Sequence, residues 1–243
     1  LKYGPIADWN TSKVDNMDFI FFNNTSNQYN LSSIQINNWD VTNVTSFKNA
    51  FQGGAYPNIK NQFNQPLDKW NVSNVTNMRV MFYGCKFNQD ISGWDMRKVK
   101  NTHGMFRFNT DFNQYIGDWS FNSLTDMSEM FQDNNYNRDI TNWNTSTVQN
   151  MNGLFAKNNV FNQDITNWNV GNVTDMEYMF EKASNFDYPL GIWYLKDNNV
   201  KTANMFNQAI KMRDYYPETP IIKNNRLEFT PAISTILQRA VLD

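Results

Sequence analysis

Tryptophan most constrains how this chain can fold, because all eight copies fall in one repeating register. Successive tryptophans are separated by 30, 31, 24, 25, 24, 25 and 25 residues, so none lies outside the pattern. The eight positions are Trp9, Trp39, Trp70, Trp94, Trp119, Trp143, Trp168 and Trp193. Periods of about 20–50 residues are typical of proteins built from stacked repeats. We therefore predict a repeat domain of about eight units over residues 1–210.

Other apolar residues keep fixed offsets from each tryptophan. The aliphatic residues three positions before it are Ile6, Ile36, Leu67, Ile91, Ile116, Ile140, Ile165 and Leu190. A valine or leucine stands five positions after it in the first seven copies, whereas the eighth copy delays Val200 by two positions. The phenylalanines that end the units are Phe21, Phe51, Phe82, Phe106, Phe131, Phe155, Phe180 and Phe206. The third to eighth copies are the regular ones.

The spacing inside one unit predicts a short strand, a turn and a short helix. In residues 74–82 apolar side chains recur at i, i+3, i+6 and i+7, which lie on one helical face. In residues 87–94 the alternation of Phe87, Gln89 and Ile91 is typical of an extended segment. One such unit cannot bury its apolar face alone, so the units must stack. The predicted fold class is an α/β solenoid of about eight rungs, with short parallel strands and short helices.

Asparagine forms a further column in the repeat. The positions are Asn64, Asn88, Asn113, Asn137 and Asn162. Tight coils leave backbone groups that need hydrogen-bond partners. We expect these amide side chains to bond from one rung to the next.

Composition and charge exclude several classes of partner and site. The net charge of −2 and the pI near 5.5 give no attraction to nucleic acid or to anionic lipid. The single cysteine, Cys85, excludes an internal disulfide and a multi-cysteine metal site. The sequence contains no run of 18 consecutive apolar residues, so it predicts no membrane span. The chain opens on "LKYGPIADW", without an initiator methionine or a leader, and we interpret it as a segment of a longer protein.

The repeat resembles a known family of microbial repeats. "FNQDISGW" followed by "VTNMRVMF" is similar to the repeat of about 25 residues in mycoplasma and other bacterial surface proteins, a variant of the BspA-like leucine-rich repeats. The resemblance covers about residues 1–210. It implies leucine-rich-repeat-like coils, a secreted, lipid-anchored or otherwise surface-exposed location, and adhesion to partners. It supplies no catalytic residues.

Two insertions interrupt the regular spacing and are candidate binding loops. They lie between Phe21 and Trp39 and between Phe51 and Phe63. Loops held by a rigid repeat often form its binding surface, which makes Tyr29 and Tyr56 candidate partner contacts. The alternative is length tolerance in asparagine-rich loops.

A C-terminal extension, residues 211–243, follows the last repeat. Thr230 as N-cap and Pro231 at the first helical position predict an amphipathic helix over about 231–242. Its apolar face consists of Ile233, Ile236, Leu237, Ala240 and Val241. This helix either caps the open end of the repeats or docks against an assembly partner.

The sequence offers little for catalysis. We expect His103, the only histidine, to be a solvent-facing helix residue and Cys85 to be a packing residue. No catalytic constellation or phosphate loop is visible, and we predict no enzyme activity, cofactor or bound metal. Tyr115, Asp139 and Asp164 share the column four residues before the tryptophan and are candidate partner contacts. Asp139 and Asp164 could share a cation, although two exposed acids are the commoner arrangement.

We therefore expect a non-enzymatic repeat protein displayed at the cell surface or outside the cell, mediating adhesion or protein–protein interaction with a protein or host-surface ligand. The alternative is a structural subunit of a larger microbial or viral assembly, docked through the C-terminal helix and the lateral faces. Carbohydrate binding rests only on aromatic rings outside the repeat columns, namely Tyr83, Phe108, Tyr115, Tyr178 and Tyr188. An assembly should self-associate, whereas an adhesion module should be monomeric.

Overall fold

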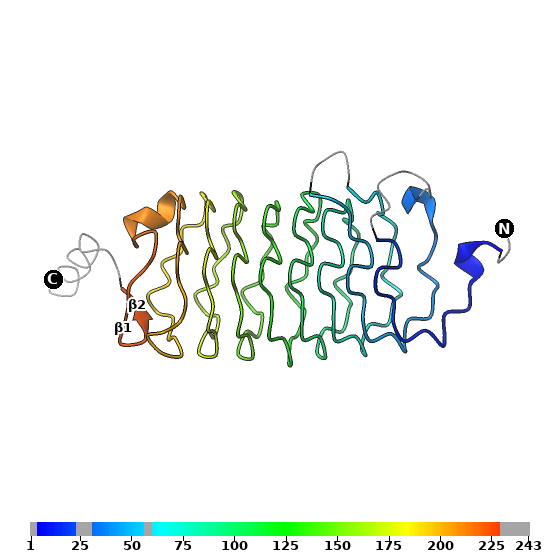
Figure 1. The fold of residues 1–243 in the computed structure, drawn as a ribbon, viewed down its shortest axis with the longest axis horizontal. Coiled ribbons are helices and arrows are strands. Elements are labelled where there is room, and N and C mark those ends of the chain that lie inside the picture. Colours follow the sequence, from blue (N-terminus) through cyan, green and yellow to red (C-terminus); the bar gives the residue numbers. More distant parts are fainter. Residues whose placement is uncertain (1–3, 23–30, 56–59, 229–243) are drawn as a thin grey trace.

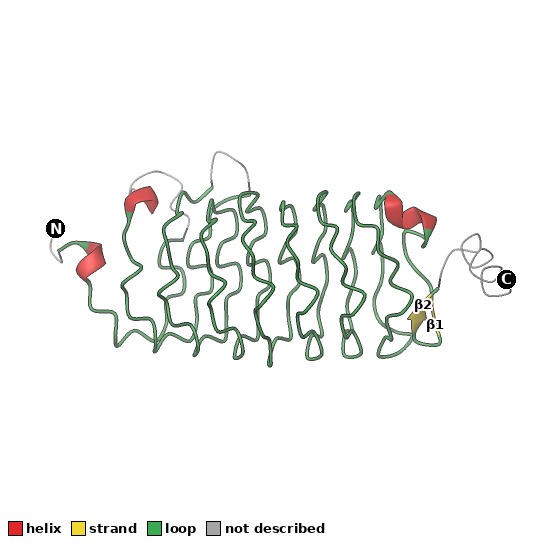
Figure 2. Cartoon of the chain, turned by 180° about the vertical axis from the view of Figure 1, so that it is seen from behind, coloured by secondary structure: helices red, strands yellow, loops and turns green. Residues whose placement is uncertain are grey.

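The chain forms an elongated row in which successive repeats lie side by side (Figure 1). The structure is a computed structural model that describes residues 4–22, 31–55 and 60–228. Most of these residues are coil and turn, as Figure 2 shows. The regular elements are three short 3-10 helices, η1 (Ile6–Asp8), η2 (Leu31–Ser33) and η4 (Lys211–Asp214), and two antiparallel strands, β1 (Ile222–Lys223) and β2 (Arg226–Leu227).

A parallel bridge joins Asn61 to Cys85, and the other parallel pairings between neighbouring repeats recur at one residue per repeat, seven positions after the tryptophan in the first seven repeats. We call this set the bridge column. Its members, in order along the row, are Asn16, Ser46, Asn77, Asn101, Asp126, Asn150, Asp175 and Lys201. The pairing does not occur in the segment that was expected to be a strand, since residues 87–94 form no strand. There the Trp94 N–H bonds to the Ile91 carbonyl at 3.1 Å, so the conserved spacing of three residues is a turn.

The prediction of a short helix at 74–82 is also wrong, because the described residues form no α-helix. The N–H groups of Met78, Val80 and Phe82 donate to carbonyls of the next repeat at 2.8–2.9 Å, not to carbonyls four residues back. Val80 has a φ of 50°, in the left-handed region, and lies in a turn that the Met81 N–H closes onto the Met78 carbonyl. Consecutive turns therefore reproduce the apolar spacing of a helix.

The apolar columns form one extended aromatic core along the row. The final phenylalanines of successive repeats stack with ring centroids 5.8–5.9 Å apart from Phe82 to Phe206. Trp39 and the tryptophans that follow it are 2–4% exposed. Each donates its Nε1 hydrogen, at 2.9–3.2 Å, to the carbonyl of the column aliphatic in the preceding repeat. The tryptophan therefore fills the core and also bonds two repeats together.

The asparagine column bonds from repeat to repeat, which confirms the expectation from sequence. In this column the Oδ1 atom of each residue accepts the backbone N–H of its equivalent one repeat on, at 2.9–3.1 Å. A second set of asparagines, which the sequence analysis did not single out, is buried at Asn61, Asn109, Asn134 and Asn158. Their Nδ2 groups donate to carbonyls of an earlier repeat. Amide side chains thus satisfy backbone groups in segments of the repeat that lack regular strand pairing.

Residues 211–228 close the C-terminal end of the row. Tyr216 stacks on Phe206 with ring centroids 5.1 Å apart, and the Phe206 N–H donates to the Glu218 carbonyl at 2.8 Å. The side chains of the helix expected over 231–242, including Ile233, Ile236, Leu237 and Val241, lie outside the described residues. None of the helices in the described ranges is long and apolar enough to cross a membrane.

Candidate interaction surface

The turns after the bridge column place charged and aromatic side chains on one long side of the row. A bridge residue first fixes the turn with its own side chain: Asn101 Oδ1 accepts the His103 N–H at 2.9 Å, and Asp126 Oδ1 accepts the Ser128 N–H at 3.0 Å. The next residue is then left-handed, as at Gly104, with a φ of 58°. The reversal leaves the following side chains at the surface of the row.

Five of these side chains meet in what we call the aromatic–charge cluster: Tyr83, His103, Arg107, Phe108 and Glu129. The Arg107 guanidinium lies over the Phe108 ring at 5.0 Å and near the Tyr83 ring at 5.9 Å. These two rings meet edge to face at 5.2 Å, and Arg107 Nη1 pairs with the Glu129 carboxylate. Three repeats contribute, so the stacked frame assembles the cluster before any partner arrives.

His103 lies at the centre of a polar chain across two repeats. Its Nδ1 is 2.7 Å from Ser128 Oγ, and Ser128 donates to Asp126 Oδ1 at 2.6 Å. The serine hydrogen is thereby used, so Nδ1 carries a hydrogen and donates to Ser128. Burial, and then the positive charge of Arg79, lower the pKa of His103, while Glu129, 3.5 Å from Nε2, opposes them.

This geometry corrects the expectation that His103 faces solvent from a helix. Its side chain is 18% exposed and lies in a turn. Although serine, histidine and a carboxylate come together here, Ser128 is 3% exposed and gives its hydrogen to Asp126. The arrangement therefore does not present an activated nucleophile to a substrate.

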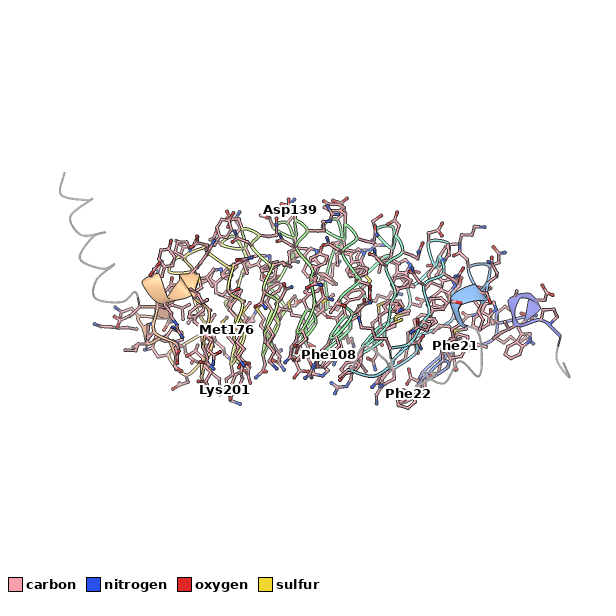
Figure 3. The ribbon with its side chains drawn as sticks, turned by 90° about the horizontal axis from the view of Figure 1, so that it is seen from above. Phe21, Phe22, Phe108, Asp139, Met176 and Lys201 are labelled. Atoms are coloured by element: carbon pink, nitrogen blue, oxygen red, sulfur yellow. The ribbon has the colours of Figure 1, made fainter. Side chains whose placement is uncertain are left out.

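A polar groove of about 450 Å³ continues along the bridge column toward the C-terminal end. Its lining consists of Thr125, Asp126, Gln149, Asn150, Thr174, Asp175, Asn199 and Lys201. Lys201 lies on the same long side of the row as Phe108, opposite Asp139 (Figure 3). Amides, carboxylates and an ammonium group in one groove suit hydrogen bonding to an extended polar ligand. Among the described residues, no group of three or more His, Cys, Asp or Glu side chains could hold a metal ion.

The structure places Tyr115, Asp139 and Asp164 away from this cluster. Tyr115 is 44% exposed and its hydroxyl donates to Asp118 at 3.0 Å. Asp139 Oδ1 accepts the Thr141 N–H at 2.9 Å, which lowers the pKa of this aspartate. Asp164 accepts equivalent bonds from its own turn, and its carbonyl accepts from the Thr141 hydroxyl at 2.8 Å. Both carboxylates therefore stabilise turns.

Tyr29 and Tyr56 lie outside the described residues. Of the aromatic–charge cluster, sequence reasoning singled out the rings of Tyr83 and Phe108 but not the charges of Arg107 and Glu129. The available signal was position: Arg107 directly precedes Phe108 and lies 13 residues after its tryptophan, the same offset that Tyr83 has in the preceding repeat.

Comparison with known proteins places this repeated chain in a family. The family described as "Mycoplasma protein of unknown function, DUF285" matches it twice, over residues 2–119 and 104–217. The chain belongs to the DUF285 family. No curated protein and no solved structure matches it. The two DUF285 matches together span the row of repeats and reach the segment that closes its C-terminal end.

Proposed function

We propose that this DUF285 chain is a solenoid of leucine-rich-repeat-like coils that acts as a non-enzymatic adhesion module on a microbial cell exterior. The observation that supports this most is the aromatic–charge cluster, held on a frame in which every repeat bonds to its neighbours. Its ligand is a protein on a host or neighbouring surface.

The chemistry of the cluster favours a protein partner. Arginine and aromatic residues are enriched at the energetically dominant positions of protein interfaces, because they bury large areas and also form directed polar contacts. Arg107 and Phe108 are half-buried and already hold each other in place. A partner that covers them therefore orders few additional side chains, which reduces the entropic cost of binding.

Binding of the fluorescently labelled chain to cultured host cells tests this proposal. The test variant is Arg107→Gln with Phe108→Asn, because asparagine tolerates the left-handed backbone that Phe108 adopts, with φ of 58°. The control is Tyr115→Ser, an exposed aromatic position beside Asp139. We expect saturable binding that the double variant lowers at least about tenfold, as loss of 1.4 kcal/mol would do, and that the control retains. Equal binding by the double variant would refute the role of the cluster.

The alternative function, a structural subunit of a larger assembly, is favoured by one observation. The first repeat exposes Trp9 and Ile20, whereas residues at the same positions are buried in every later repeat. Light scattering on the chain, with and without residues 229–243, separates the two functions. A monomer in both forms supports adhesion, and an oligomer supports assembly. Loss of the oligomer on truncation would assign the contact to the C-terminal segment, and its persistence would assign it to another surface such as the exposed first repeat.

A further inference from the structure

The N-terminal end of the row exposes residues that belong to the core. Trp9 is 43% exposed, against 2–4% for the seven later tryptophans. Ile20 is 36% exposed, whereas its equivalents from Ala50 to Met205 are fully buried. A hollow of about 530 Å³ opens here, lined by Trp9, Val14 and their neighbours. This end therefore has the composition of an interface between two repeats and lacks the covering repeat within the described residues.

The backbone at this end carries a matching pattern of acceptors. In the second repeat the carbonyls of Ser46, Lys48 and Ala50 accept N–H groups of the first repeat at 2.8–3.0 Å. The equivalent carbonyls of the first repeat belong to Asn16, Asp18 and Ile20. None of these three carbonyls accepts a backbone hydrogen bond from a described residue. A covering segment must therefore offer three N–H groups at alternate residues, together with aromatic side chains in register.

We propose that this end is a docking site for one further coil of the same repeat. Every interface inside the row shows the same combination, in which a repeat donates alternate N–H groups to the carbonyls of the repeat after it. The regular repeat contains this donor set at Thr102, Gly104 and Phe106, which bond to carbonyls of the next repeat at 2.8–3.1 Å. The inference stands on these interfaces and is independent of the adhesion role.

A second copy of the chain does not fit this site. Two N-terminal ends placed face to face would set carbonyls against carbonyls, which repel. The opposite end has already used two of its three donors, since the Phe206 N–H bonds to the Glu218 carbonyl and the Asn204 N–H to Thr219 Oγ1, and Tyr216 covers the Phe206 ring. The row is therefore closed at one end and receptive at the other, and the occupant is a coil with unused N–H groups.

A fusion tests the docking site directly. A copy of residues 87–110 placed before Leu1 puts its tryptophan 25 residues ahead of Trp9, the spacing of the regular repeats. Ile20→Cys provides the probe in both proteins, because the native Cys85 is fully buried. We expect the thiol at position 20 to react at least about a hundredfold more slowly in the fusion.

The matched control carries serine in place of the tryptophan, valine and final phenylalanine of the added copy, and its thiol should react at the rate of the unfused chain. The melting temperature of the fusion with native Ile20 is the second readout, and it should rise. An unchanged thiol rate together with an unchanged melting temperature would overturn the proposal. So would protection of the unfused chain with increasing protein concentration, because that would make a second copy the occupant.

Discussion

Replacing Trp143 tests whether the tryptophan column joins the repeats. This indole is 3% exposed and lies between Trp119 and Trp168, with ring centroids 6.3 and 6.2 Å away. Its Nε1 donates to the Ile116 carbonyl at 2.9 Å. Trp143→Ala removes the ring and the hydrogen bond together, whereas Trp143→Phe keeps an aromatic ring and removes the donor.

The expected losses differ between the two variants. Truncation of a buried tryptophan to alanine typically costs about 3–5 kcal/mol, because the cavity collapses only in part. Loss of the donor alone removes one buried hydrogen bond, which typically costs about 0.5–1.5 kcal/mol, because the Ile116 carbonyl still accepts the Trp119 N–H at 3.2 Å. Exposed Ile192 serves as the control, since its side chain is 61% exposed and its replacement by alanine should change stability by about 0.5 kcal/mol or less.

Urea unfolding, followed by circular dichroism, measures these differences. Hydrogen exchange then shows which repeats lose protection, because a row of repeats is stabilised mainly by its nearest-neighbour interfaces. Protection should fall first in the repeats that contain Trp119 and Trp168. A loss of less than about 1 kcal/mol in Trp143→Ala, relative to a typical 3–5 kcal/mol, would refute the idea that this column bonds the row together.

Three further predictions concern single positions. Gly84→Ala should destabilise the chain strongly in thermal melts, because φ is 53° and an added Cβ would lie 2.1 Å from the Gly54 carbonyl oxygen; Gly93→Ala, whose Cβ meets nothing within 4 Å, is the neutral control. The pKa of His103 lies below its unfolded value, so the unfolded chain binds the extra proton and stability should fall as pH drops below about 6.5; His103→Gln should flatten that slope in urea melts, and an equal slope would contradict it. Burial raises the pKa of Cys85 to about 12, so iodoacetamide at pH 8 should label it only after unfolding, and rapid native labelling would contradict this.

The repeat columns were predictable because they depend on spacing alone. The register of Trp119 with Ile116 and the inter-repeat bond from the Asn113 N–H to Asn88 Oδ1 follow from residues at constant offsets. The predicted helix over residues 74–82 failed because Val80 adopts a left-handed φ angle that its side chain does not suggest. A signal existed in the glycines and asparagines that share the position of Val80 in other repeats, such as Gly104.

The candidate interaction surface was less predictable than the core. Arg107 meets Tyr83 of the previous repeat and Glu129 of the next, so its role depends on the order in which repeats are stacked and on the side that each turn faces. The turn geometry sets that side, and the helical interpretation assigned it wrongly. His103 was expected at the surface for the same reason.

The hydrogen bonds between repeats run from each coil to the next along the length of the row, and this has a mechanical consequence (Figure 1). A force that pulls the two ends apart loads the outermost interface first, so the coils should peel away singly and not shear as a block. Each coil of about 25 residues then releases roughly 80–90 Å of extended chain. A surface tethered through such a row would yield in a series of small steps, each dissipating energy, while the remaining coils keep their structure.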